Sequence, residues 1–388
     1  MRSLAIFLVI LLIIVAAVAV FLVATMPRQV AGIHAPLGQR ERNLIAQVPA
    51  SAEAFAIVPT AAAVDAKLRA NPITREAMEK WRANQPLPQP WMIGDADLVA
   101  WKSNGAMHYF LRVDPFRAFI VRILGHGQII SSPGGQPVDS EIVDLASRLP
   151  PGDLLVVQRE NARGAFPPIA RPAVTSVAVT SSEIRLTSVA PPPSAASAGP
   201  ARAPHPIRFP RGAILSAAFT SPPRIISDLN RLFGTKVSAL FDDGGMLCIY
   251  DVDLRKLLPR PLGVFVLPDD PQRRAIADSF HSLVRSGQKD GMLLLSFDHS
   301  IEQYQKDVFE QPAVVGNAWT VLLDPPRLVP ILNSLGENLG LRIAAPRLFR
   351  SARDLGHWIS GLEQAKVIEA SDSADPQGET LQVRIASK

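Results

Sequence analysis

The sequence predicts an α+β protein: an N-terminal transmembrane helix followed by two related α+β units of antiparallel sheets with helices packed on them. Three observations predict it: a long uncharged apolar run at the N-terminus, a Pro-rich stretch in mid-chain, and apolar strands that alternate with capped amphipathic helices. The expected organisation of the 388 residues is a transmembrane anchor at 1–26, a juxtamembrane linker at 27–47, a first domain at 48–189, a Pro/Ala-rich linker at 190–208 and a second domain at 209–388.

The apolar run between Leu4 and Met26 contains no charged residue over 23 positions. At about 1.5 Å per helical residue it would extend about 35 Å, enough for a hydrocarbon core about 30 Å thick. Pro27 would end the helix, and Arg28 would lie at the interface. We therefore expect a single-pass signal-anchor in the cytoplasmic (inner) membrane, with the bulk of the chain extracytoplasmic as a periplasmic domain. A cleaved signal peptide is the alternative, although its apolar region is usually shorter.

The linker at 190–208 is rich in Pro, Ala and Ser and has no hydrophobic periodicity. Such a stretch cannot bury an apolar face, so we expect it to be extended or disordered. The segments on its two sides open alike from Val48 and from Phe209, each with Pro, a small-residue turn, an apolar strand and a helix. Further segments align at offsets of 139 or 140 residues: 101–114 with 240–253, 152–156 with 291–295 and 172–174 with 312–314. The shared order and spacing predict an internal duplication.

Turn motifs and apolar runs predict three strand pairs. Asn104-Gly105 and Asp243-Gly244 each lie between apolar segments, as in hairpin turns whose two central residues accept positive φ. The predicted pairs are 98–101 with 107–113, 237–241 with 246–252 and 366–371 with 379–387. Asp followed by Pro, as at Asp324-Pro325, predicts helix N-caps and not a series of catalytic acids.

An amphipathic helix is predicted at 347–366, and it contains the pattern Arg-Asp-Leu-x-x-Trp-Ile. Together with the P-x-x-A opening strand, the repeated strand–Asp–Pro–helix step and the leading apolar span, it resembles an uncharacterised family of bacterial membrane-anchored proteins with a domain of unknown function. The resemblance covers most of residues 48–388 and rests on structural motifs. It implies no catalytic residues.

The charge distribution argues against nucleic acid as a partner. The formal net charge is +5, but the terminal segment 1–46 and the stretch 190–211 each contribute +3, so the remainder is nearly neutral. Nucleic-acid-binding proteins concentrate Lys and Arg with interleaved aromatics, and aromatics are only 6% of this chain. Neither G-x-x-x-x-G-K-[ST] nor G-x-G-x-x-G occurs, which argues against a nucleotide.

The sequence indicates no catalytic, cofactor-binding or metal-ligating residues, and it implies no cofactor. Ser286 and Lys289 have S-x-x-K spacing, but they lie in a Gly-containing loop without the companion motifs. His299 lies near acidic residues, but a strand end followed by a helix cap explains that segment. The single cysteine, Cys248, lies in an apolar strand and is interpreted as a buried, inert thiol. Paired carboxylates distant in sequence stay open, because nothing in the sequence favours one pair.

The function expected from these observations is a membrane-anchored extracytoplasmic binding or scaffolding module of the cell envelope, with an envelope protein as its partner. Two alternatives stay open: an envelope hydrolase with an unrecognised site, and a protein that binds a lipid or another apolar ligand. A hydrolase predicts a pocket whose residues have shifted pKa values. A lipid binder with a sheet-lined groove predicts a continuous apolar cavity, whereas a scaffold predicts a filled core and exposed apolar patches.

Overall fold

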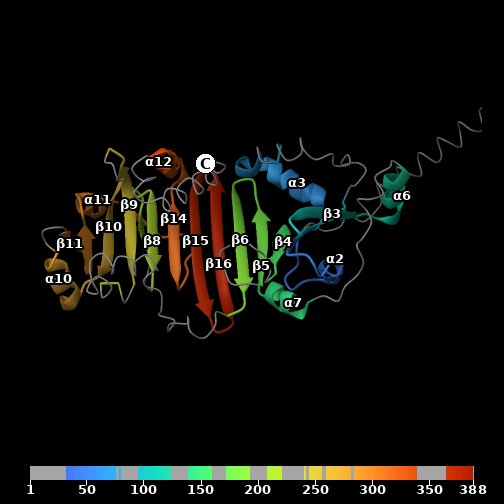
Figure 1. The fold of residues 1–388 in the computed structure, drawn as a ribbon, viewed down its shortest axis with the longest axis horizontal. Helices are drawn as coiled ribbons and strands as arrows, with labels where there is room; N and C mark the ends of the chain where they lie inside the picture. Colours follow the sequence, from blue (N-terminus) through green and yellow to red (C-terminus); the bar gives the residue numbers. More distant parts are fainter. Residues whose placement is uncertain are drawn as a thin grey trace, which may run out of the picture.

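The computed structural model describes residues 32–387, except for 76–77, 80–94, 124–138, 160–171, 193–207, 221–239, 242–243, 256–258, 281–283 and 339–363. Fourteen of its strands form one sheet in which every neighbouring pair is antiparallel, and two short strands form a second sheet. The large sheet runs along the length of the molecule, and helices lie beside it (Figure 1).

The first half of the large sheet contains β1 (Ala54–Val58), β2 (Asp97–Ser103), β3 (Ala106–Arg112), β4 (Leu154–Gln158), β5 (Ala173–Val179) and β6 (Glu183–Ala190). The second half contains β8 (Leu215–Phe219), β9 (Gly245–Asp253), β10 (Arg260–Pro268), β11 (Arg285–Lys289), β12 (Met292–Ser296), β14 (Trp319–Leu323), β15 (Ala365–Asp375) and β16 (Gly378–Ser387). The small sheet pairs β7 (Phe209–Pro210) with β13 (Phe309–Glu310). The described helices are α2 (Gln39–Ile45), α3 (Ala61–Ala70), α6 (Pro115–Ile123), α7 (Ser140–Ser147), α10 (Pro271–Asp278), α11 (Ser300–Lys306) and α12 (Pro325–Glu337).

The two halves repeat one strand order. It reads β3-β2-β1-β4-β5-β6 in the first half and β10-β9-β8-β14-β15-β16 in the second, and the hairpin of β11 and β12 is added beside β10. The strands that correspond in this order differ from the segments aligned in the sequence. The alignment matched 246–252, within β9, to β3, whereas the topology matches β9 to β2. The predicted duplication therefore has a topological counterpart, but in a different register.

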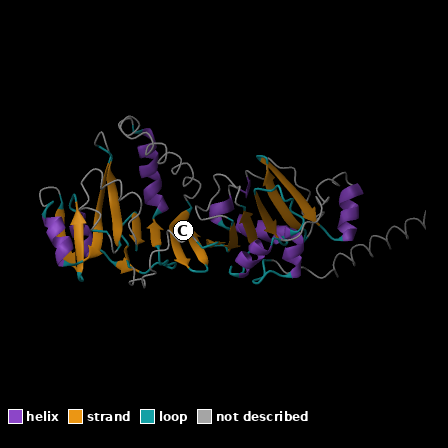
Figure 2. Cartoon of the chain, turned by 60° about the horizontal axis from the view of Figure 1, so that its bottom comes forward, coloured by secondary structure: helices purple, strands orange, loops and turns teal. Residues whose placement is uncertain are grey.

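The expectation of two separate sheet units is wrong, because the two halves share a single sheet. β16 pairs with β6 over eight residues, from Glu379 opposite Ala190 to Ala386 opposite Glu183. This pairing satisfies the hydrogen-bonding edges that the two halves would otherwise expose. The C-terminal strands thus lie in the middle of the molecule, and the C-terminus lies between two groups of strands and helices (Figure 2).

The membrane assignment is also corrected. None of the helices in the described ranges is long and apolar enough to cross a membrane. The predicted anchor between Leu4 and Met26 lies outside the described residues. The structure therefore gives no support for a transmembrane helix, a signal-anchor or a single-pass inner-membrane location with an extracytoplasmic domain. Residues 32–47, expected in the juxtamembrane linker, instead include α2 and contribute to the first core.

Two of the three predicted strand pairs are confirmed. Leu98 lies opposite Leu111 in the β2–β3 hairpin, and Asn104 and Gly105 both have positive φ. The C-terminal strands pair as expected, with Ile368 opposite Ile385. The pairing of 237–241 with 246–252 is wrong, because β9 pairs with β8 and β10. The predicted cap is confirmed: an Asp324 carboxylate oxygen accepts the backbone N–H of Arg327 at the start of α12.

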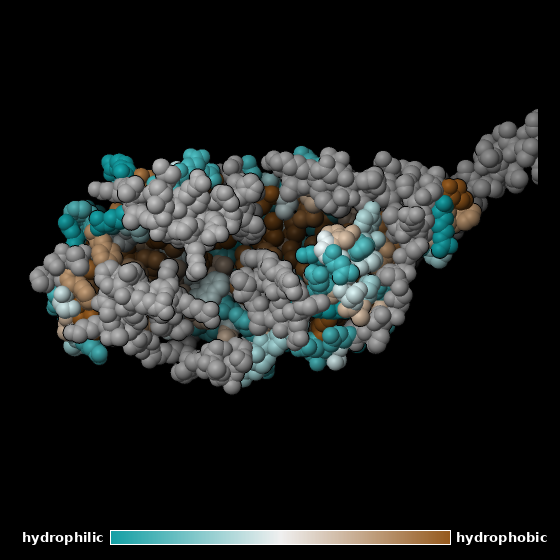
Figure 3. Space-filling view, in the orientation of Figure 1, coloured by the Kyte–Doolittle hydropathy of each residue, from teal (hydrophilic) through white to brown (hydrophobic). Residues whose placement is uncertain are grey.

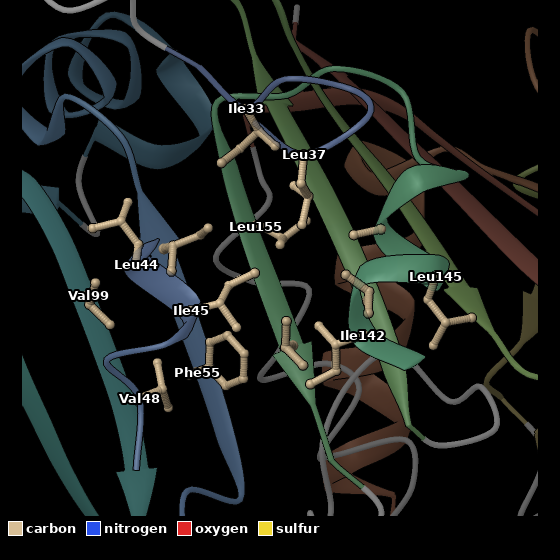
Figure 4. Packing of buried hydrophobic residues seen from close by; sticks show 14 of the residues in the cluster. Ile33, Leu37, Leu44, Ile45, Val48, Phe55, Val99, Ile142, Leu145 and Leu155 are labelled. Atoms are coloured by element: carbon tan, nitrogen blue, oxygen red, sulfur yellow. The ribbon is translucent and has the colours of Figure 1, made fainter. Parts of the chain in front are cut away.

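Helices cover both faces of the sheet, and the two faces have separate hydrophobic cores. On one face, α2 and α7 place Leu44, Ile45, Ile142 and Leu145 against the strands of the first half (Figure 4). On that same face, α11 packs Ile301 and Tyr304 against β9, β10 and β12. The other face is contacted by apolar residues of α3, α10 and α12. The central strands β15, β16 and β6 lie between these helix-covered regions, and they hold the candidate site.

Candidate functional site: a buried carboxylate at the centre of the sheet

The central strands present two chemically different faces, because side chains alternate along a strand. Register aligns Val383 with Leu186 and Ala370, and Ile385 with Ile184 and Ile368, on what we call the apolar face. The intervening residues form the charged face, where Arg384 lies opposite Arg185 and Glu369. Adjacent residues of the same strand therefore lie in very different surroundings.

The apolar face is incompletely covered. Leu381, Val383 and Ile385 are buried, whereas Leu186, Ala370 and Trp319, which pack against the same cluster, are only half-buried. On the side of the molecule drawn in Figure 3, hydrophobic side chains lie at the floor of hollows, as expected where an apolar sheet surface is partly open. Partly open apolar surfaces of this kind are typical of ligand or partner sites.

Asp372 interrupts the apolar face near the β15–β16 turn. In the sheet register it lies between Trp319 of β14 and Leu381 of β16. The residue is only 9% exposed, and its Oδ1 atom has no hydrogen-bond partner among the described residues. A buried carboxylate oxygen without a partner is costly, since the lost hydration is not replaced. Such groups are rare in folded proteins and indicate strain, a missing ligand or a functional role.

The surroundings of Asp372 raise its pKa from the usual 3.8 to about 6. Burial is the largest cause, because it removes water from the charged form, and the nearby Glu379 carboxylate adds to it by like-charge repulsion. Hydrogen bonds from the Ser373 backbone and the Trp319 side chain favour the charged form but offset only part of the effect. Asp372 therefore exchanges its proton near pH 6, and it can act as a donor when protonated or an acceptor when ionised.

The β15–β16 turn positions Glu379 beside Asp372. Glu379 lies opposite Ala374 of β15 and Ala190 of β6, two positions along β16 from Leu381 and on the same face. One Asp375 carboxylate oxygen closes the turn by accepting the backbone N–H groups of Gln377, at 2.8 Å, and Gly378, at 2.9 Å. Gly378 is required here, because its φ is +156° and a Cβ atom would approach the carbonyl oxygen of Ala190 to 2.3 Å.

The charged face, in contrast, has paired ionic groups. The Arg384 Nε atom donates to Glu183 at 2.9 Å, and its Nη1 atom lies 3.4 Å from Glu369. Arg185 forms a second ion pair with Glu183, at 2.7 Å, and the backbone N–H of Ala313 donates to Glu369. These charges neutralise one another across β6, β16 and β15. The charges of this face are therefore paired with one another among the described residues, and they do not indicate a ligand site.

The residues singled out in the sequence do not form a catalytic site. Ser286 and Lys289 lie in β11, where the Lys289 Nζ atom donates to the carbonyl oxygens of Tyr304 and Gln305. Asp298 accepts the backbone N–H of Ser300 at the start of α11. The described residues contain no group of three His, Cys, Asp or Glu arranged to hold a metal ion. Burial raises the pKa of the Cys248 thiol to about 12, so this cysteine is inert.

Asp372 and Glu379 were not among the candidate residues that the sequence indicated. The segment Ser-Asp-Ser-Ala-Asp-Pro-Gln-Gly at 371–378 has the composition of a polar turn, and Asp375 does have that role. The available signal was the alternation along 379–387, which places residue 379 on the same face as Leu381, Val383 and Ile385. Asp372 joins that face only through the register of the hairpin and through its neighbour Trp319 in β14.

Comparison with known proteins adds no assignment. The chain matches no protein-family model, no curated protein and no solved structure. The resemblance to a family of bacterial anchored proteins, the protein partner and the absence of nucleic-acid and nucleotide binding all stay predictions. The function is therefore argued from the geometry of the central strands.

Proposed function

We propose that the protein is a binding module whose apolar face holds an amphiphilic ligand with an apolar body and a cationic, hydrogen-bond-donating head. The apolar body would lie on the half-buried residues around Leu186, Ala370 and Trp319. The head would meet the carboxylates of Asp372 and Glu379. The single observation that carries this proposal is the unpartnered Oδ1 atom of Asp372, 91% buried within an apolar surface.

Charge complementarity selects a cationic head over an anionic one. Two neighbouring carboxylates in apolar surroundings repel, and this repulsion contributes to the raised pKa of Asp372. An ammonium group placed between them would relieve the repulsion and donate to the free oxygen of Asp372. An anionic head would add a third negative charge and would be rejected.

A hydrolase is the second candidate, since a carboxylic acid with a pKa of about 6 beside another carboxylate suits general acid–base catalysis. The apolar surroundings favour the binding module, because Trp319 and Leu381, the cross-strand neighbours of Asp372, would pack against an apolar body. Release of a cleavage product from a bound substrate would favour the hydrolase.

The test is titration calorimetry with dodecylammonium, dodecanol and dodecanoate, each below its critical micelle concentration. We expect dodecylammonium to bind at least tenfold more tightly than dodecanoate, and its affinity to increase as pH rises through about 6, where Asp372 ionises. The Asp372→Asn variant should lose this preference while it retains binding of dodecanol. Arg185→Ala, on the opposite face, is the matched control and should behave as the wild type.

Two results would overturn the proposal. One is the absence of binding of all three probes to folded protein. The other is equal affinity for dodecylammonium in the wild type and in Asp372→Asn, which would show that the carboxylate has no part in recognition.

A further inference from the structure

The two ends of the large sheet are unlike. β11 forms one end, and it carries the polar residues Arg285, Gln288 and Lys289, the kind of residues that protect an edge from further pairing. β3 forms the other end, and it consists of Ala106–Arg112 with the sequence Ala-Met-His-Tyr-Phe-Leu-Arg. It contains no Pro or bulge, and its only cation, Arg112, is at its last position.

The repeated topology shows what covers the equivalent edge. β3 corresponds in strand order to β10 of the second half. β10 is not an edge, because β12 pairs with it antiparallel, placing Leu295 opposite Phe265 and Leu293 opposite Leu267. No described strand has this role beside β3. In the second half, an apolar antiparallel strand thus covers the edge that corresponds to β3.

Exposed apolar side chains gather at the β3 end. Met107 is 69% exposed, and Phe119 and Ile123 of α6, which follows β3 in the chain, are 62% and 67% exposed. Figure 1 shows α6 at the same end of the molecule as β3. His108 is held against the sheet by Trp101, with ring centroids 5.5 Å apart and nearly parallel planes. The edge is therefore ordered and apolar.

The sequence of β3 is self-complementary. The two-residue turn makes Ser103 and Ala106 a hydrogen-bonded pair, so Met107, Tyr109 and Leu111 direct their N–H and C=O groups outward. When two copies pair antiparallel about Tyr109, each of these three residues lies opposite one of the same three residues in the second copy. Tyr109 lies opposite Tyr109, Met107 opposite Leu111, and Arg112 opposite Ala106, so no charge faces a like charge.

We infer that the β3 edge is an interface with a second copy of this chain, formed by antiparallel β3–β3 pairing centred on Tyr109. The pairing would extend the sheet across a two-fold axis and satisfy the outward backbone groups of both copies. It would join equal edges of two molecules much as β6 and β16, which are equivalent in strand order, join the two halves of one molecule.

The first test is the oligomeric state of the full chain by sedimentation equilibrium. We expect a dimer that Met107→Lys converts to monomer, because each Lys would lie opposite an apolar residue at the paired edge. Gln288→Lys, at the β11 edge, is the matched control and should leave the dimer intact. Met107 is largely exposed, so its substitution should leave the circular dichroism spectrum unchanged.

The second test reads the register directly by oxidative crosslinking. Tyr109→Cys places two thiols on directly opposed residues about 5.5 Å apart at Cα, within disulfide range, so a covalent dimer should form. Met107→Cys places its two thiols about 14 Å apart at Cα and should not crosslink. Cys248 is buried and does not interfere. A monomeric wild type, or a dimer that neither responds to Met107→Lys nor crosslinks through Tyr109→Cys, would overturn the inference.

Discussion

The two faces of the central strands differ in how their charged side chains are paired, although the same strands form both faces. On the charged face, Arg384 of β16 lies next to Glu183 of β6 and Glu369 of β15, so each buried charge meets an opposite one. On the apolar face, Asp372 has Trp319 and Leu381 as its cross-strand neighbours and a carboxylate, Glu379, as its nearest charge. The first arrangement stabilises the junction of the two halves, and the second destabilises it.

The two faces differ in whether their charges are satisfied within the fold. A paired ionic network needs no external partner, since its interactions are complete within the fold. An unpaired, buried carboxylate is retained at a cost in stability, and sites of binding or catalysis are where such costs are commonly found. We therefore infer that Asp372, and not the more numerous charges on the opposite face, belongs to a functional site.

The largest expected effect is on the charged face. Arg384→Ala would leave Glu369, whose side chain is only 7% exposed, with its charge no longer paired by Arg384. Removing one partner of a buried ion pair typically costs about 3–5 kcal/mol, so we expect a loss of about 3 kcal/mol in the free energy of unfolding. Urea denaturation at pH 7 measures it. A loss below about 1 kcal/mol would mean that the network is not structurally important.

The apolar face should respond in the opposite direction. The raised pKa means that the folded state holds the Asp372 proton more tightly than the unfolded state, so this group lowers stability as pH rises from about 4 to about 6. One pKa unit corresponds to about 1.4 kcal/mol, so the penalty above pH 6 is about 3 kcal/mol. Asp372→Asn should therefore be more stable than the wild type at pH 8 by up to that amount.

The pH series supplies its own control. At pH 3 and below, Asp372 is protonated in the folded state and mostly protonated in the unfolded state, so Asp372→Asn should differ little from the wild type. Urea denaturation at several pH values measures the difference. An Asp372→Asn variant that is less stable than the wild type at pH 8 would contradict the interpretation of this carboxylate.

A smaller effect is expected from Glu379→Gln. This change removes the neighbouring negative charge, so the pKa of Asp372 should fall toward its usual value while burial keeps it raised. The decline in stability with rising pH should therefore end at a lower pH than in the wild type, with a gain of no more than about 1 kcal/mol at pH 8. The same pH series measures it. An unchanged pH dependence would show that burial alone perturbs Asp372.

The smallest effect is expected from Arg185→Ala on the charged face. The Arg185 side chain is 64% exposed, and exposed ion pairs contribute about 0–1 kcal/mol. Glu183 would keep its contact with Arg384. We expect a loss of less than about 1 kcal/mol by urea denaturation, and further weakening of the difference in high salt. A loss equal to that of Arg384→Ala would mean that the two arginines act as one unit.

The local elements of the fold could be predicted because short-range chemistry specifies them. Asn104-Gly105 selects a two-residue turn, since both residues accept positive φ, and the β2–β3 hairpin follows. Asp324 before Pro325 caps α12. The alternation along 379–387 predicts a strand with one apolar face. This strand pairs with 366–371, and only a short turn separates the two segments.

Pairing between strands that are distant in the sequence depends on the folded structure. Glu183 and Arg384 lie 201 positions apart, and no local pattern indicates that β6 and β16 join two halves into one sheet. Since side chains alternate with period two, a slip of one residue in that register would move every side chain to the opposite face. Turns, caps and the alternation of polar and apolar residues along a strand follow from local sequence. The sheet register, in contrast, pairs Arg384 with opposite charges and leaves Asp372 without one, because this pairing depends on neighbours from distant strands.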